Sequence, residues 1–219
     1  EMCIRDSPSS LTKEASLKQM NPKMLTSFVD GTKTMVEMAA LANFLGFNID
    51  IDGMHGIEAT YENINQYYIP KKDGGLLEQS QVVDFAFGIA PGVFAVIYSE
   101  DDYVNYEMEY LKMGKGPYWT LARPYHLTSL EIPRTIRHIM LEKYSKLSAQ
   151  SWNVEVVAHA KQDIEPGTNL GSIGGDYIYG KAQKTSSSKG LLPIGIAEDN
   201  VVTKACLLYT SPSPRDGVQ

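Results

Sequence analysis

Hydrophobic and polar residues follow two different periods along this chain, and together they predict an α+β fold. Apolar residues recur at helical spacing over 31–45, and Gly46 is placed to end that helix. Short runs of β-branched and aromatic residues predict strands. These runs cover residues 23–28, 47–51, 82–87, 93–98, 118–122, 154–158 and 177–179. Further helices are predicted over 101–113 and from residue 128 or 129 to about residue 143.

The helical periodicity nearly disappears after about residue 150. Residues 151–205 combine short apolar runs with glycine- and serine-rich turns, which is typical of a small all-β module. We therefore expect an α+β body over 8–150, in which a mixed or antiparallel sheet is covered by helices on one face. A partial all-β module is expected to follow over 151–205. The runs over 82–87 and 93–98 are expected to form neighbouring strands of the sheet.

The two ends of the chain differ in character from the body between them. Residues 1–7 resemble the translation of the mosaic end used in transposase-based sequencing libraries, and residues 206–219 contain a match to the same adapter read from the other strand. The alternative is a genuine tail rich in Pro and Ser. Both cysteines, Cys3 and Cys206, lie in these ends. If the ends are adapter-derived, the body can form no disulfide, thiolate zinc site or cysteine nucleophile.

Composition and charge exclude several classes of protein. The chain has 219 residues, of which 43% are hydrophobic and 21% charged, as in ordinary globular domains. The net charge of −6 argues against a nucleic-acid binder but not against a small anionic substrate. No run of about 18 apolar residues is present, so we expect no membrane span. Because no secretory signal precedes the body, the expected compartment is the cytoplasm.

The first candidate site is Asp30-Gly-Thr-Lys33, at a predicted junction between a strand and a helix. Backbone N–H groups at the start of a helix favour an anion. A lysine in the first turn opposes the helix dipole, which favours a role for Lys33 toward a nearby carboxylate, phosphate or reacting oxygen. Asp30 could cap the helix, pair with Lys33 or handle a proton. The alternative is a solvated cap with a surface lysine.

The second candidate is His55, which stands between Gly53 and Gly56. Glycines allow the backbone to approach a ligand closely, and histidine exchanges a proton most readily near neutral pH. The alternative is a tight turn with an incidental histidine.

The third candidate is Arg123-Pro-Tyr-His126, directly before a predicted helix. Arg123 can grip a carboxylate or phosphate with two parallel hydrogen bonds, Tyr125 can donate one, and His126 can act as an acid or a base. The alternative is a loop that enters a helix and carries a surface arginine. Four loop acids could in principle bind a metal, but we expect them to be solvated and predict no metal site. They are Asp50, Asp52, Asp101 and Asp102.

Several segments together resemble the homoserine-dehydrogenase-like NAD(P)-dependent oxidoreductases that carry a C-terminal SAF domain. In the body these segments are 24–33, 53–56, 91–94, 114–117 and 123–133. Residues 160–170 and 191–198 resemble the SAF (β-clip) part of that family. The resemblance spans nearly all of residues 20–205, and the Asp-Gly-Thr-Lys and Arg-Pro-Tyr-His segments are its most specific motifs.

The resemblance implies hydride transfer between NAD or NADP and a small hydroxy- or oxo-substrate, which could be phosphorylated. Relatives in that family include the 1-deoxy-D-xylulose-5-phosphate reductoisomerase-like enzyme. Such proteins begin with a Rossmann domain, and this chain lacks the dinucleotide fingerprint. The chain is therefore expected to be a fragment, with the cofactor bound mainly by the missing domain and with an SAF-like module that stops at about residue 205.

The resemblance also assigns expected roles to the candidate residues. The expected catalytic residues are Lys33, His126 and Asp30, and the expected substrate-binding residues are Arg123, His55, Thr32 and Tyr125. The expected partners are a small-molecule substrate and further copies of the chain in a homo-oligomer, with no nucleic acid and no membrane.

A second hypothesis is a non-catalytic module that binds a carbohydrate or another protein. It predicts that the candidate side chains lie far apart, whereas the enzyme hypothesis predicts that Lys33, His55, Arg123 and His126 face one cleft.

Overall fold

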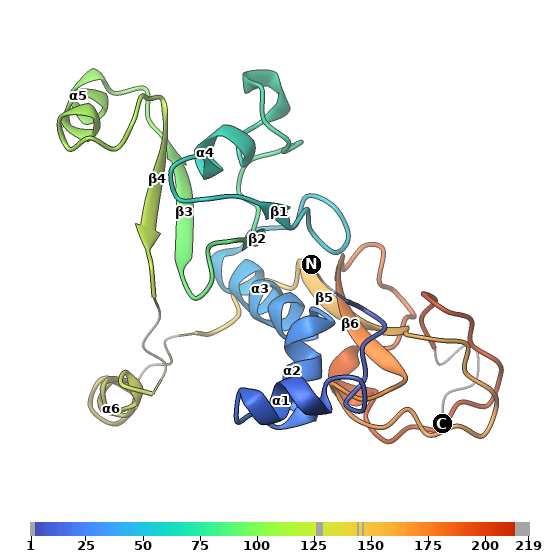
Figure 1. Ribbon diagram of the computed structural model, residues 1–219. Coiled ribbons are helices and arrows are strands. Elements are labelled where there is room, and N and C mark those ends of the chain that lie inside the picture. Colours follow the sequence, from blue (N-terminus) through green and yellow to red (C-terminus); the bar gives the residue numbers. More distant parts are fainter. Residues whose placement is uncertain (1–2, 126–128, 144, 146, 213–219) are drawn as a thin grey trace. The chain divides into compact units, whose positions relative to one another are not determined.

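The computed structural model describes residues 3–125, 129–143, 145 and 147–212 (Figure 1). The chain forms two compact units, of which unit 1 comprises residues 1–54 and 149–219 and unit 2 comprises residues 55–148. Both units combine helices with small sheets, so the predicted α+β class is confirmed. The sheets are three two-stranded ribbons, one parallel and two antiparallel.

Unit 1 starts with three helices: α1 (Thr12–Leu17), α2 (Pro22–Val29) and α3 (Thr32–Leu45). Gly31 and Gly46 flank α3 and have φ angles of 84° and 71°, in the left-handed region that glycine adopts without strain. The helix predicted over 31–45 and its end at Gly46 are therefore confirmed.

The strand predicted over 23–28 is wrong, because this segment forms α2. The side chain of Asn21 accepts a hydrogen bond from the Lys23 amide, and Pro22 occupies the first helical position, so the start of a helix is well specified. Leu25 lies buried in a small core, and Val29, four residues later, packs against that core. This spacing is helical, which the apolar run alone did not reveal.

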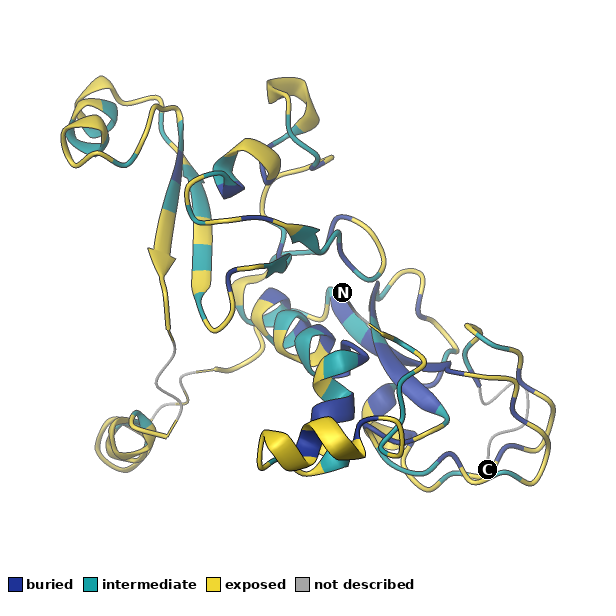
Figure 2. Cartoon of the chain, in the orientation of Figure 1, coloured by how far each residue is buried: buried dark blue, intermediate teal, exposed yellow. Residues whose placement is uncertain are grey.

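The second part of unit 1 is a hairpin of two antiparallel strands. In β5 (Val154–Ala160) and β6 (Ile178–Lys184), Val154 pairs with Lys184 and Ala160 with Ile178. The hairpin is mostly buried (Figure 2), and α3 packs against both strands. A short 3₁₀ helix, η3 (Ile194–Ile196), packs on β5. Both strands are longer than predicted, since they are covered along their whole length.

The segment 47–51 forms no regular strand, contrary to the prediction. The side chain of Ile49 is fully buried, but the chain turns after it, and the Gly53 amide donates a hydrogen bond to the Ala182 carbonyl in β6. Burial of one isoleucine therefore explains the apolar pattern without a strand.

Unit 2 is built around two ribbons and a core of five buried residues. Its strands are β1 (Ile57–Glu58), β2 (Ala86–Phe87), β3 (Val93–Tyr98) and β4 (Tyr118–Arg123). Its helices are α4 (Ile64–Tyr67), η1 (Lys71–Asp73), α5 (Asp102–Tyr110), α6 (Ile132–Arg137) and the π-helical turn η2 (His138–Glu142). The core consists of Ala59, Ile64, Tyr68, Leu77 and Ile89. The strands predicted over 93–98 and 118–122 are confirmed as the antiparallel pair β3 and β4.

The run over 82–87 is a strand only at Ala86–Phe87, and it pairs with β1 rather than with β3. The reason lies in the middle of the run. Asp84 turns its buried carboxylate toward the amides of His55, Gly56 and Phe85, and residues 83–85 form no strand ladder. The predicted adjacency of 82–87 and 93–98 is therefore wrong.

The compact units do not follow the linear division expected from the sequence. The chain returns to unit 1 at Ala149, two residues before the expected boundary near Ser151. Unit 1, however, also contains α1 to α3, so the β5–β6 hairpin shares a compact unit with helices from the start of the chain. The domain limits 8–150 and 151–205 stay a prediction.

The described parts of both end segments belong to unit 1 and bond to the rest of it. The Cys3 amide donates to the Val29 carbonyl, and the Tyr209 amide donates to the Ala160 carbonyl. Their origin as adapter sequence stays a prediction, so no site is assigned from them. Within the described residues, no helix has both the length and the apolar character needed to cross a bilayer.

Asn43 joins α3 to the start of β5 and provides a test of unit 1. Its amide nitrogen donates to the Val154 carbonyl at 2.8 Å, and its oxygen accepts from the Asn153 and Val154 amides at 2.8 and 3.0 Å. We expect Asn43→Ala to lower the free energy of unfolding by about 1–3 kcal/mol, because these backbone groups lose their partners. The matched control is Glu37→Ala in the same helix, at an exposed position, which should change it by less than about 0.5 kcal/mol. Urea unfolding followed by circular dichroism measures both, and equal effects would contradict the prediction.

His159 predicts a dependence of stability on pH. Burial in β5 is the largest effect on its pKa and lowers it, and the charge of Lys181 acts in the same direction. The unfolded chain therefore binds this proton more readily, so the His159 contribution to stability is complete above about pH 6.5 and falls as the pH decreases below that value. We expect the loss of stability between pH 7 and pH 5 to be smaller in His159→Gln than in the unmodified chain. Unfolding curves at both pH values measure the difference, and parallel losses would refute the assignment.

Candidate active site

The imidazole of His55 and the carboxylate of Asp84 form a close pair in unit 2. His55 Nδ1 lies 2.8 Å from Asp84 Oδ2. The Asp84 side chain is 3% exposed and that of His55 is 17% exposed. A buried carboxylate that holds a partly accessible imidazole is an arrangement that can serve general acid–base chemistry.

Asp84 is held by the backbone as well as by the imidazole. It accepts hydrogen bonds from the amides of His55 at 3.0 Å, Gly56 at 3.1 Å and Phe85 at 2.8 Å. Several N–H groups that converge on one carboxylate form a concave anion site built from main chain. The carboxylate therefore has a fixed position before any ligand binds.

The hydroxyl of Tyr68 completes this arrangement. It donates toward Asp84 Oδ1 at 3.2 Å and to the Phe85 carbonyl, and it accepts from the Ile57 amide at 3.4 Å. Burial, and after it the charge of Asp84, raises the pKa of Tyr68 well above its usual range. The hydroxyl therefore keeps its proton near neutral pH and stays a donor.

Gly56 is required by the loop that carries His55. Its φ angle is 57°, and a Cβ at this position would lie 2.3 Å from Cζ of Phe85. The group that approaches Gly56 is therefore the Phe85 ring, and the expected close approach of a ligand to this glycine stays a prediction.

Arg123 ends β4 and has partners at the surface of unit 2. Its Nη2 lies 3.2 Å from Glu131 Oε1, and its guanidinium carbon lies 5.2 Å from the centre of the Tyr125 ring. Both members of the ion pair are well exposed, so an anionic ligand could replace Glu131 at modest cost. His126, the expected catalytic residue of this motif, lies outside the described residues.

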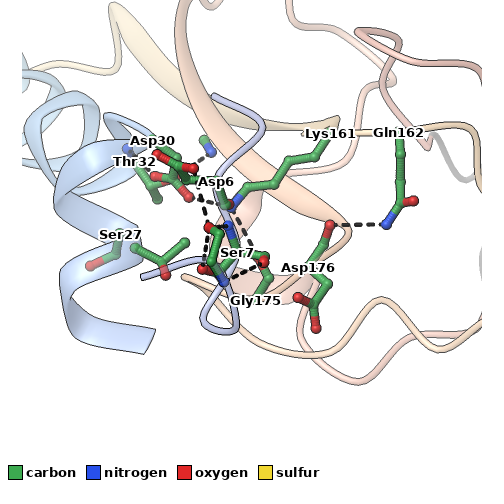
Figure 3. A network of polar contacts seen from close by, with 12 residues as sticks. Asp6, Ser7, Ser27, Asp30, Thr32, Lys161, Gln162, Gly175 and Asp176 are labelled. Carbon is green, nitrogen blue, oxygen red and sulfur yellow. Dashed lines mark hydrogen bonds and ion pairs between the residues drawn. The ribbon is translucent and has the colours of Figure 1, made fainter. Parts of the chain in front are cut away.

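Asp30 is buried in unit 1 in an ion pair that spans much of the sequence. Its Oδ2 lies 2.7 Å from Lys161 Nζ, and the two side chains are 0% and 2% exposed. Asp30 Oδ1 accepts from the Thr32 amide at 2.9 Å, the Thr32 hydroxyl accepts from the Gly180 amide at 2.8 Å, and Lys161 Nζ donates to the Gly175 carbonyl at 2.9 Å (Figure 3). Of the three alternatives for Asp30, the structure shows a bond to the first amide of α3, although Gly31 is the N-cap residue, and the ion-pair partner of Asp30 is Lys161 rather than Lys33.

Lys33 lies in the first turn of α3 and contacts other residues at the surface of unit 1. Its Nζ lies 3.5 Å from Glu37 and 3.9 Å from the centre of the Phe28 ring, and its side chain is 41% exposed. The expected junction between a strand and a helix is wrong, because the motif joins α2 to α3. This environment agrees with the alternative of a capped helix with a surface lysine, and the catalytic role of Lys33 stays a prediction.

The expected site residues are divided between the two units. Unit 1 holds Asp30, Thr32 and Lys33, and unit 2 holds His55, Arg123 and Tyr125. Within unit 2, His55 and Arg123 have different partners. The single cleft expected for Lys33, His55, Arg123 and His126 stays a prediction.

Asp84 and Lys161 were not among the expected site residues. For Asp84 a signal existed, since it is an acidic residue inside the otherwise apolar and aromatic run over 82–87. For Lys161 no local signal existed, because its partner Asp30 lies far away in the sequence.

Each unit also has a surface cavity of about 630 Å³. The cavity in unit 1 is lined partly by Arg5, Ser7 and Leu208, from the segments that resemble adapter sequence. The cavity in unit 2 contains Tyr118, whose hydroxyl donates to Asp73 at 2.6 Å. Burial and then Asp73 raise the pKa of Tyr118 to about 12. Neither cavity involves His55 or Asp84.

Two of the four loop acids considered as metal ligands have other roles. Asp101 caps α5 by accepting from the Val104 amide at 3.0 Å, and Asp52 accepts from the Lys184 amide at 3.3 Å. Among the residues that the structure describes, no three His, Cys, Asp or Glu side chains are grouped to hold a metal ion.

The sequence of the chain was compared with models of known protein families. Residues 2–132, more than half of the chain, match the family described as "Oxidoreductase DRL, catalytic domain". The chain belongs to this family. A search of curated proteins finds no match.

The DRL catalytic domain match covers most of the candidate residues. His55, Asp84, Tyr68 and Asp30 all lie within residues 2–132, whereas Lys161 lies beyond them. The expectation of an oxidoreductase catalytic portion is therefore confirmed at that level.

The contribution of the buried Asp30–Lys161 ion pair to stability can be tested directly. We expect Lys161→Met to lower the free energy of unfolding by about 3–5 kcal/mol, because it leaves the Asp30 charge buried without its partner. The double variant Asp30→Asn/Lys161→Met removes both charges and should be less destabilised than Lys161→Met.

The matched control for this ion pair is Lys33→Met, which removes an exposed lysine from the neighbouring motif and should cost less than about 1 kcal/mol. Urea unfolding, together with hydrogen exchange of the β5 and β6 amides, measures the three variants. A Lys161→Met chain as stable as Lys33→Met would show that the buried pair does not hold unit 1 together.

Proposed function

We propose that this chain is the substrate-binding and catalytic portion of an NAD(P)-dependent oxidoreductase that acts on a small hydroxy- or oxo-substrate, in some cases phosphorylated. Membership in the oxidoreductase DRL catalytic-domain family supports the reaction class. The observation that carries the site assignment is the His55–Asp84 pair, in which a buried carboxylate supports a partly accessible imidazole. An imidazole in this arrangement can accept the proton of a substrate hydroxyl or return it to an oxo group.

Residues 171–175 do not fit a dinucleotide site. The glycine-rich segment 171–175 lies in the connection between β5 and β6, without the strand, tight turn and helix that bind a pyrophosphate. We infer that NAD or NADP, which would supply the hydride chemistry, is held mainly by a separate domain. The contribution of this chain is then to bind and orient the substrate and to move its proton.

The remaining roles follow the resemblance to homoserine-dehydrogenase-like enzymes. Arg123 is proposed to hold the carboxylate or phosphate of the substrate by exchanging Glu131 for the ligand, and Tyr125 to donate a hydrogen bond beside it. Lys33 and His126 are proposed to handle a proton or polarise the reacting oxygen. Thr32 is proposed to support substrate binding indirectly, since its side chain is buried and its hydroxyl accepts from the Gly180 amide.

Asp30 is proposed to act indirectly, since its carboxylate is fully buried against Lys161. The segments 160–170 and 191–198 are proposed to form an SAF-like module, and the whole protein is proposed to work as a homo-oligomer in the cytoplasm.

The test of this function uses the chain joined to the separate dinucleotide-binding domain that we propose for it. We expect oxidation of NADH or NADPH that depends on an oxo-substrate, or reduction of NAD or NADP that depends on a hydroxy-substrate, and we expect His55→Ala to lower kcat by about 10²–10⁴-fold. The control is His138→Gln, since His138 lies in η2 beside Glu142 and should be neutral for kcat. Unchanged kinetics in His55→Ala would remove His55 from the site.

Arg123 gives a separate test in the same protein. We expect Arg123→Ala to raise KM more than it lowers kcat, because it removes binding of the substrate anion. The control is Arg134→Ala on α6, an arginine near the end of that helix, which should leave KM unchanged. Equal KM values in Arg123→Ala and the unmodified enzyme would contradict the anion-binding role.

A further inference from the structure

We infer that Asp84 is a positioning residue that holds neutral His55 in the tautomer with the proton on Nδ1, so that Nε2 is the nitrogen that exchanges a proton with the substrate. This inference rests on the proposed function for the role of Nε2. Its structural part, the tautomer and its cause, stands on the geometry around Asp84.

In the pair of His55 and Asp84, the imidazole is the hydrogen-bond donor. At neutral pH a carboxylate is an acceptor only, and imidazole Nδ1 can be either donor or acceptor. Asp84 Oδ2 lies 2.8 Å from Nδ1. The proton between them therefore belongs to Nδ1, and in the neutral ring Nε2 then carries the lone pair.

Backbone amides fix the orientation of the Asp84 carboxylate. Its Oδ1 already accepts from the Phe85 amide at 2.8 Å and from the Gly56 amide at 3.1 Å. Rotation of the carboxylate would break these bonds in a site where Asp84 is almost fully buried. Oδ2 therefore stays directed at the His55 ring.

Asp84 also fixes the orientation of the His55 ring. Asp84 binds His55 at two points, through the main-chain amide at 3.0 Å and through Nδ1 at 2.8 Å. A side chain tied to one carboxylate by both its backbone and its ring has little rotational freedom. The direction of Nε2 is thus fixed together with the tautomer.

Tyr68 supports Asp84 from the side of the core. Its ring belongs to the core of unit 2 and lies 5.7 Å from the Phe94 ring, centre to centre. Its hydroxyl, which stays protonated, donates to Asp84 Oδ1 and to the Phe85 carbonyl. It contacts the carboxylate and not the pair between Oδ2 and Nδ1, which makes Tyr68 a matched comparison for Asp84.

The tautomer can be measured directly on the full 219-residue chain. Two-bond ¹H–¹⁵N correlation spectra distinguish the two tautomers of each histidine, and the His55 signals are assigned by their loss in His55→Gln. We expect neutral His55 to show the pattern of a protonated Nδ1 and an unprotonated Nε2. A pattern with the proton on Nε2 overturns the inference, and this measurement needs no variant of Asp84.

Variants of the two supporting residues test the cause. We expect Asp84→Asn to lose the single Nδ1–H pattern, because an amide offers Nδ1 a donor as well as an acceptor. Tyr68→Phe should keep the pattern, since the carboxylate still faces Nδ1. Loss of the pattern in both variants would show that packing rather than the Asp84 charge selects the tautomer, and retention in a folded Asp84→Asn chain would do the same.

Glu142→Gln serves as the control for a carboxylate beside another histidine, since Glu142 lies 3.6 Å from His138 Nδ1. The His55 pattern should not change in this variant. If it changes, the assignment of the signals and with it the inference fails.

The kinetic consequence separates this inference from the proposed function. In the full-length enzyme, Asp84→Asn should lower kcat by about 10²-fold or more with little change in KM, because the base presents the wrong nitrogen. If His55 shows the expected tautomer but His55→Ala keeps full activity, the positioning of the ring stands and the function fails. If His55→Ala is inactive but the proton lies on Nε2, the function stands and the role of Asp84 fails.

Discussion

A carboxylate can be buried in a folded chain only where hydrogen-bond donors or a positive charge offset the loss of its hydration. Each unit of this protein contains such a buried carboxylate. In unit 2 the carboxylate is Asp84, and its donors come from the backbone of two segments that are distant in sequence. This requirement brings the His55 loop beside residues 84–85, next to the point where β1 and β2 pair in parallel. Removing the charge would remove the reason for that adjacency, so the local fold and the candidate chemistry have the same cause.

Unit 1 satisfies its buried carboxylate in a different way. Asp30 accepts a hydrogen bond from the Thr32 amide at the start of α3. It also forms an ion pair with Lys161, which directly follows β5. A charge pair without solvent costs desolvation on both sides, and it is retained only where further hydrogen bonds complete it. Lys161 has these bonds, including one to the Gly175 carbonyl. The pair therefore specifies how the hairpin region docks on the helices, and its burial argues for an indirect role of Asp30 in any chemistry.

Local sequence signals predicted the parts of the fold that depend on local energies. The helix before Gly46 follows from apolar periodicity and a glycine that can adopt positive φ, and β3 and β4 follow from runs that are half buried. The errors have local causes as well. The run over 23–28 reads as β-branched and aromatic, but its preceding Asn21-Pro22 pair specifies a helix start.

The candidate site was predicted only in part, because its partners are set by the tertiary fold. The loop around His55 was identifiable from its glycines, while Asp84 was hidden in a run that looked like a strand. Lys161 carries no signal at all, since nothing near it in sequence refers to Asp30. Sequence patterns thus identified residues with chemical potential, and only the fold determines which of them are paired with a buried charge.

Lys161 lies outside the segment that matches the family, but it is the ion-pair partner of a residue inside that segment. The matched segment ends at residue 132, yet Asp30 within it is neutralised by a lysine beyond that limit. Thr32, also within it, receives the Gly180 amide from β6, and α3 packs on both hairpin strands. A segment cut at residue 132 would expose the apolar face of α3 and leave the Asp30 charge without its lysine. The segment around Asp30 is therefore completed by the C-terminal part of unit 1, and we expect α1 to α3 to fold stably only together with the β5–β6 hairpin.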